Sequence, residues 1–110
     1  MSKGNTLDII YKILSRLDKA MDEENPDLSD ISFEALEISE IKWVRILQMM
    51  VERGLIDGVE FIDFCGQSYP SIKFMDTRIT LEGIEYLMDN STQAKLFRAA
   101  KELKDFIPGL

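Results

Sequence analysis

The fold is indicated by residues 36–87, which begin with Leu36-Glu37-Ile38-Ser39 and end with the run Arg78-Ile79-Thr80-Leu81-Glu82-Gly83-Ile84-Glu85-Tyr86-Leu87. Ser39 is a good N-cap, because its hydroxyl can accept a hydrogen bond from a backbone N–H of the first helical turn. Gly54 is a good stop, because glycine takes the left-handed conformation that ends many helices. Together they predict a helix over about residues 40–53.

Apolar residues recur along this helix at spacings of three and four, as expected for a helix with one buried face. Projected at about 100 degrees per residue, the predicted buried stripe contains Trp43, Val44, Leu47, Met50 and Val51. The opposite face carries Lys42, Arg45, Met49 and Arg53. We therefore expect a locally basic exposed surface with Met49 in it, and Ile46 as a second apolar residue that this surface could expose.

Two strand patterns follow this helix, Val59–Phe64 and Ser71–Met75, and both are rich in β-branched and aromatic residues. The turn-rich segment Cys65–Pro70 joins them, so we predict a β-hairpin within a wing of about residues 55–76. Thr80 is the N-cap of a further helix, predicted over about residues 80–90 with Leu81, Ile84, Leu87 and Met88 inward. A helix, a turn, a second helix and a hairpin in this order predict an α+β winged-helix fold.

An amphipathic helix is also predicted at the start of the chain, with Asn5 or Thr6 as its N-cap. Its predicted buried residues are Leu7, Ile10, Leu14, Leu17 and Met21. The helix should end near Asn25-Pro26, because the residue before a proline disfavours the helical conformation.

The chain after this helix is acidic. Residues 1–40 hold ten acidic and four basic side chains, and residues 22–40 hold eight acids with no lysine or arginine. We predict an acidic loop over about residues 22–31, a short strand at Asp30–Ser32 and one helical turn at Phe33–Leu36 with both end residues inward. Such a run is most often a solvated surface; the alternative is a surface that repels phosphate or attracts a basic partner.

A last helix is predicted over about residues 92–107, with Ser91 as its N-cap. Its predicted buried residues are Leu96, Ala99, Ala100, Leu103 and Ile107. Phe97 lies off this stripe and would pack on the first helix of its own chain or of a second copy, so a homodimer remains open. Residues 1–110 are expected to form one domain, since a chain of this length builds one core.

The composition argues against catalysis. The chain has no histidine, which excludes a Ser-His-Asp catalytic triad and the usual zinc ligands. It also has no glycine-rich phosphate-binding loop. The acidic run lacks the spacing of a calcium loop. We therefore expect no catalytic residues, no cofactor and no metal.

Its hydropathy predicts a cytoplasmic protein that does not enter a membrane. No apolar segment approaches the roughly 20 residues that span a bilayer, and the N-terminus does not look like a signal peptide. The single cysteine, Cys65, agrees with a reducing compartment.

Nearly the whole chain also resembles the YjcQ-like family. The resemblance is carried by Gly54-Leu55-Ile56-Asp57-Gly58-Val59, by residues 79–87 and by the ending Asp105-Phe106-Ile107-Pro108-Gly109-Leu110. It implies a winged-helix fold and a setting in phages, prophages and chromosomes of Gram-positive bacteria. Members have no established molecular activity, so the resemblance implies no mechanism.

Two binding functions remain open. On DNA, Lys42, Arg45 and Arg53 would contact phosphate, and Gln48 would pair with adenine. The wing would add Gln67, Ser68, Tyr69 and Lys73. The acidic run disfavours DNA, and a left-handed Glu37 in the turn would cost about 1 kcal/mol. We therefore predict a protein partner, centred on Met49, with a dimeric DNA-binding regulator as the alternative.

Overall fold

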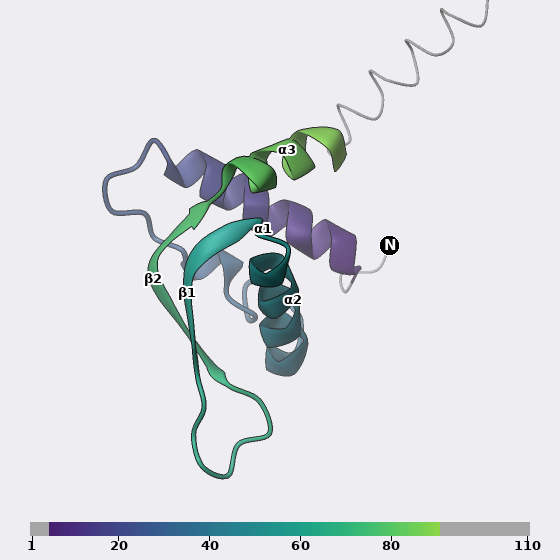
Figure 1. Cartoon of the computed structure of the whole chain (residues 1–110), viewed down its shortest axis with the longest axis vertical. Helices are drawn as coiled ribbons and strands as arrows, with labels where there is room; N and C mark the ends of the chain where they lie inside the picture. The colour runs from purple at the N-terminus through teal and green to yellow at the C-terminus, as the bar shows by residue number, and fades with distance from the viewer. Residues whose placement is uncertain (1–4, 91–110) are drawn as a thin grey trace, which may run out of the picture.

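The computed structural model describes residues 5–90, which form a winged-helix-like α+β fold (Figure 1). The elements in order are α1 (Thr6–Ala20), η1 (Ser29–Ile31), α2 (Glu40–Glu52), β1 (Ile56–Ile62), β2 (Ser71–Ile79) and α3 (Leu81–Asn90). The fold class predicted from the sequence is confirmed. The helix predicted over residues 92–107 lies outside the described residues.

The predicted caps determine where the helices begin and end. Asn5 accepts hydrogen bonds from two backbone N–H groups of α1 at 3.0 and 3.3 Å. Ser39 and Thr80 each accept one from the backbone N–H three residues later, at 3.1 and 3.0 Å. Gly54 has a φ of 74° just after α2. These caps are local features, so they are confirmed almost to the residue.

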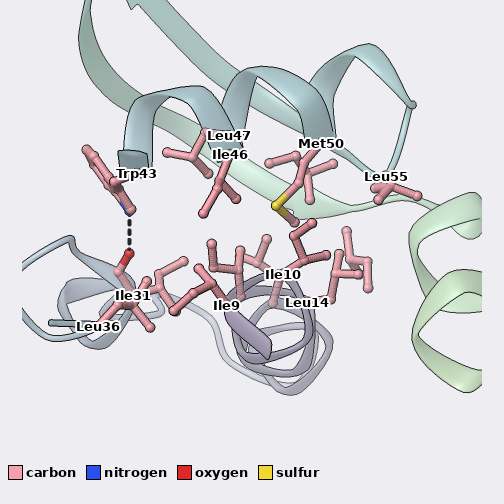
Figure 2. Packing of buried hydrophobic residues seen from close by; sticks show 14 of the residues in the cluster. Ile9, Ile10, Leu14, Ile31, Leu36, Trp43, Ile46, Leu47, Met50 and Leu55 are labelled. Atoms are coloured by element: carbon pink, nitrogen blue, oxygen red, sulfur yellow. Dashed lines mark hydrogen bonds between the residues drawn. The ribbon is translucent and has the colours of Figure 1, made fainter. Parts of the chain in front are cut away.

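The core lies between α1 and α2. Figure 2 shows Ile9, Ile10 and Leu14 of α1 pointing toward Ile46, Leu47 and Met50 of α2. The α2 residues of this set are at most 1% exposed. β1, β2 and α3 close the core at one end through Leu55, Ile56, Ile79 and Leu87.

The buried face of α1 contains Ile10, Leu14 and Leu17, as predicted, but the prediction is wrong at its two ends. Leu7 and Met21 are 61% and 64% exposed, whereas Ile9 and Ile13 are fully buried. The helix contains two overlapping apolar stripes, and both satisfy helical periodicity. Contact with α2 selects the stripe that contains the two isoleucines, which periodicity alone does not reveal.

The segment between α1 and α2 lacks the predicted strand but contains the predicted helical turn, in which the Leu36 N–H donates a hydrogen bond to the Ser32 carbonyl oxygen at 3.0 Å. Residues 29–31 form the 3-10 helix η1, and hydrogen-bonded turns follow over residues 32–37. Glu37 has a φ of 59°, the left-handed conformation considered above, and it stops the turn from continuing as a helix. Phe33 and Leu36 do point inward, as predicted.

Trp43 links the segment between α1 and α2 to α2 itself. Its indole Nε1 donates a hydrogen bond to the Ile31 carbonyl oxygen at 2.9 Å (Figure 2). Its ring lies 5.6 Å from that of Phe33 and 5.9 Å from that of Phe74, measured between centroids. The predicted buried role of Trp43 is therefore confirmed, since it joins η1, α2 and β2.

The hairpin is longer than predicted and contains a bulge. β1 and β2 pair from Ile56 with Ile79 to Ile62 with Ser71. The register shifts at Gly58, whose φ is 77° and where a Cβ would lie 2.6 Å from the Asp76 carbonyl oxygen. Asp76 itself has a φ of 55°. Glycine is therefore required where β2 crosses so close to β1.

α3 packs Ile84 and Leu87 against the core, as predicted, but Leu81 and Met88 do not face it. Leu81 and Met88 are 68% and 63% exposed, whereas Leu87 is 9% exposed. Gly83 is the residue that faces the core at the first turn, because its Cα lies against the Leu55 carbonyl group. Because Gly83 has no side chain, α3 can pack closely against the backbone at Leu55.

Candidate functional site

The outer face of α2 carries an exposed column with four-residue spacing. Ile41, Arg45, Met49 and Arg53 are all exposed, and the fractions for Ile41 and Met49 are 37% and 45%. Residues four apart on a helix lie one above the other. Apolar and basic side chains therefore alternate along this face, and the exposure predicted for Arg45, Met49 and Arg53 is confirmed.

Other residues of α2 depart from the prediction. Ile46 is 1% exposed, and Figure 2 shows it pointing toward α1, so it is a core residue. Lys42, Gln48 and Val51 are half-buried. Glu52, which the prediction left out, is exposed. The outer face is consequently less basic than predicted, and Ile41 rather than Ile46 is its second apolar residue.

Two hollows adjoin Met49. One of about 420 Å³ is lined by Ile41, Arg45 and Ile46, and one of about 230 Å³ by Leu7, Arg53 and Tyr86, among others. Thr6 and Met49 line both. We call the exposed residues of this region the Met49 surface: Leu7, Ile41, Arg45, Met49 and Arg53. Sequence reasoning missed Leu7, because periodicity assigned it to the core of α1.

Of the predicted wing residues, Tyr69 reaches the start of α2. Gln67, Ser68 and Lys73 are exposed in or beside the loop of the hairpin. Tyr69 is half-buried, and its hydroxyl donates a hydrogen bond to the Glu40 carboxylate at 3.2 Å, which raises the pKa of the phenol. Glu40 is the first residue of α2, whereas Met49 lies near its other end. The structure therefore places Tyr69 at the start of α2, which also carries Lys42, and away from Met49.

Arg16 organises the acidic loop. Its guanidinium lies 2.9 Å from Glu23 and 2.9 Å from Asp30, and it donates a hydrogen bond to the Asp27 carbonyl oxygen at 3.0 Å. The Arg16 side chain is only 15% exposed. The loop is therefore held against α1 by one side chain, and two of its acids are already paired.

Asp27 makes the stability of this loop depend on pH. Hydrogen bonds from the Ser29 backbone N–H and hydroxyl lower its pKa from the ordinary 3.8. A carboxyl whose pKa is lower in the folded chain stabilises the fold above pH 3.8 and loses this effect as the pH falls through its folded pKa.

We expect Asp27→Asn to lower stability at neutral pH but to differ little from the wild type well below pH 3.8, where both side chains are uncharged. Urea denaturation at the two pH values measures this difference. An equal loss of stability at both values would show that the Asp27 charge has no role.

Within residues 5–90, no three histidine, cysteine, aspartate or glutamate side chains gather as a metal site. No helix within that range is long and apolar enough to cross a membrane.

Comparison with known proteins identifies the family. No curated protein and no solved structure matches the chain. The family described as YjcQ protein matches residues 11–106, a range that contains most of α1 and every later element. The chain therefore belongs to the YjcQ protein family.

Proposed function

We propose that this chain is a non-enzymatic winged-helix binding module, that its partner is a protein, and that the Met49 surface makes the contact. The supporting observation is that three apolar side chains, Leu7, Ile41 and Met49, are 61%, 37% and 45% exposed. Arg45 and Arg53 flank them. Apolar residues with arginine at the rim are typical of protein interfaces. The partner would present an apolar side chain with carboxylates around it.

The alternative, a DNA-binding regulator, is less well supported. DNA affinity comes largely from basic side chains that contact phosphates, and the start of the second helix of such a motif lies closest to the duplex. Glu34, Glu37 and Glu40 are exposed there. A phage or prophage setting is part of the proposal, and it rests only on the family resemblance.

The test begins with capture of partners by the immobilised chain from a nuclease-treated lysate of a Gram-positive bacterium. Binding of each recovered protein is then measured by surface plasmon resonance. We expect Met49→Asp to raise the dissociation rate roughly tenfold or more, because it puts a charge in the apolar centre.

Met75→Asp is the matched control, since Met75 is 48% exposed on β2 and lies outside the Met49 surface. Equal effects of the two substitutions would contradict the proposed site. Submicromolar binding to a defined duplex at physiological salt that is lost on Arg45→Ala would instead support the DNA-binding alternative.

A further inference from the structure

A second concave surface lies between the acidic loop and β2. It is a groove of about 530 Å³, with Glu24, Pro26 and Leu28 on the loop side and Phe74 and Asp76 on the β2 side. Trp43 also lines it. Figure 1 shows the chain after α1 passing β2 on the side away from β1. We call this hollow the β2 groove.

The lining of the β2 groove combines aromatic and acidic side chains. Trp43 and Phe74 meet edge to face, with 5.9 Å between their centroids. Glu24 is exposed and has no ion pair within residues 5–90, and the Asp76 side chain is 77% exposed. Aromatic rings next to carboxylates suit a cationic side chain, because its stem packs on the rings and its charge meets the acids.

Among the described residues, Arg78 stands near both acids, because Glu24, Asp76 and Arg78 line a second hollow together. Arg78 contacts Asp76 at 2.7 Å, but both side chains of this pair are at least 70% exposed, so a ligand can displace it at little cost. The loop side adds the exposed carboxylate of Glu24, while Glu23 and Asp30 of the same loop are paired with Arg16. The β2 groove is therefore electrostatically matched to a basic ligand.

β2, which borders the β2 groove, is an edge strand of a two-stranded sheet. Within residues 5–90, β2 pairs only with β1. The short strand predicted at residues 30–32 would have been a candidate to cover its outer edge, but this segment starts as the 3-10 helix η1. A strand edge without a second strand partner favours ligands with an extended backbone.

We propose that the β2 groove binds an extended basic segment of a partner protein, with a lysine or arginine side chain packed on Trp43 and Phe74 between Glu24 and Asp76. This site differs from the Met49 surface and does not depend on it. Met49 points outward from α2, whereas Trp43 is 8% exposed and joins α2 to η1 and β2.

Trp43 supplies a direct measurement, because it is the only tryptophan of the chain. The probe is the synthetic peptide acetyl-Gly-Lys-Val-Arg-Val-Lys-Gly-amide, which has no aromatic residue, titrated into the full chain at low salt. We expect a saturable change in Trp43 fluorescence. The same peptide with glutamate in place of its three basic residues should give none.

Paired substitutions separate the β2 groove from general attraction. Glu24→Gln combined with Asp76→Asn should weaken peptide binding roughly five- to tenfold, and asparagine tolerates the left-handed backbone of Asp76. The control, Asp22→Asn with Glu34→Gln, removes the same charge from exposed acids that do not line the groove. It should change the affinity less than twofold.

Several results would overturn the proposal. The first is that the basic peptide leaves Trp43 fluorescence unchanged, and the second is that both double variants weaken peptide binding equally. The third is that Trp43 fluorescence changes when the protein concentration alone is raised, which would identify a second copy as the occupant. Met49→Asp should leave peptide binding unchanged, so failure at either site is distinguishable from failure at the other.

Discussion

Leu47→Ala is expected to lower the free energy of unfolding by about 2 to 5 kcal/mol, because it leaves a cavity at the centre of the α1–α2 contact. Leu47 is fully buried and lies opposite α1 (Figure 2). A domain of this size has a total stability of about 5 to 15 kcal/mol, so the loss is a large share of it. Urea denaturation of the purified variant measures the change.

Met49→Ala is the control for Leu47→Ala. It shortens another apolar side chain of the same helix, but Met49 is 45% exposed. We expect a cost within about 0.5 kcal/mol, as for most surface substitutions. A greater loss from Met49→Ala than from Leu47→Ala would mean that α2 is rotated and that the Met49 surface is part of the core.

Gly83→Ala should destabilise the fold although alanine is the better helix former. A Cβ at this position would overlap the Leu55 carbonyl oxygen and lie 2.7 Å from the Ile79 side chain. The gain in helix propensity is about 1 kcal/mol. Displacing α3 from a backbone group should cost more than that, and we expect a net loss of about 2 to 3 kcal/mol in urea denaturation.

Glu85→Ala is the matched substitution for Gly83→Ala, since Glu85 lies in the same helix and is exposed. It should change stability by less than about 0.5 kcal/mol. Stabilisation by Gly83→Ala would show that α3 is not pressed against Leu55 and would remove the reason for glycine at this position.

Features that depend on neighbouring residues in the chain were predictable from the sequence. The caps Asn5, Ser39 and Thr80 and the stop at Gly54 are of this kind, because each acts on the turn next to it. The family resemblance also anticipated the family that matches. The α+β order then follows from where the helices and strands begin and end.

Features that depend on distant parts of the chain were not predictable. The rotation of α1 follows from contact with α2, and it exposes Leu7 beside Met49. The path of the acidic loop follows from Arg16, which lies in α1. No sequence spacing indicates that Arg16 reaches Asp30. The β2 groove could therefore not be predicted from the sequence, because this loop forms one of its walls.

The position of Trp43 has a consequence for how the domain opens. Its side chain holds three segments at once, through the Ile31 carbonyl group, Phe33 and Phe74. A two-stranded hairpin has little stability of its own, and a short 3-10 turn has less. Because both are joined to α2 by the same indole, they lose their support together. We therefore expect the acidic loop, α2 and the hairpin to open as one cooperative unit in hydrogen exchange rather than separately.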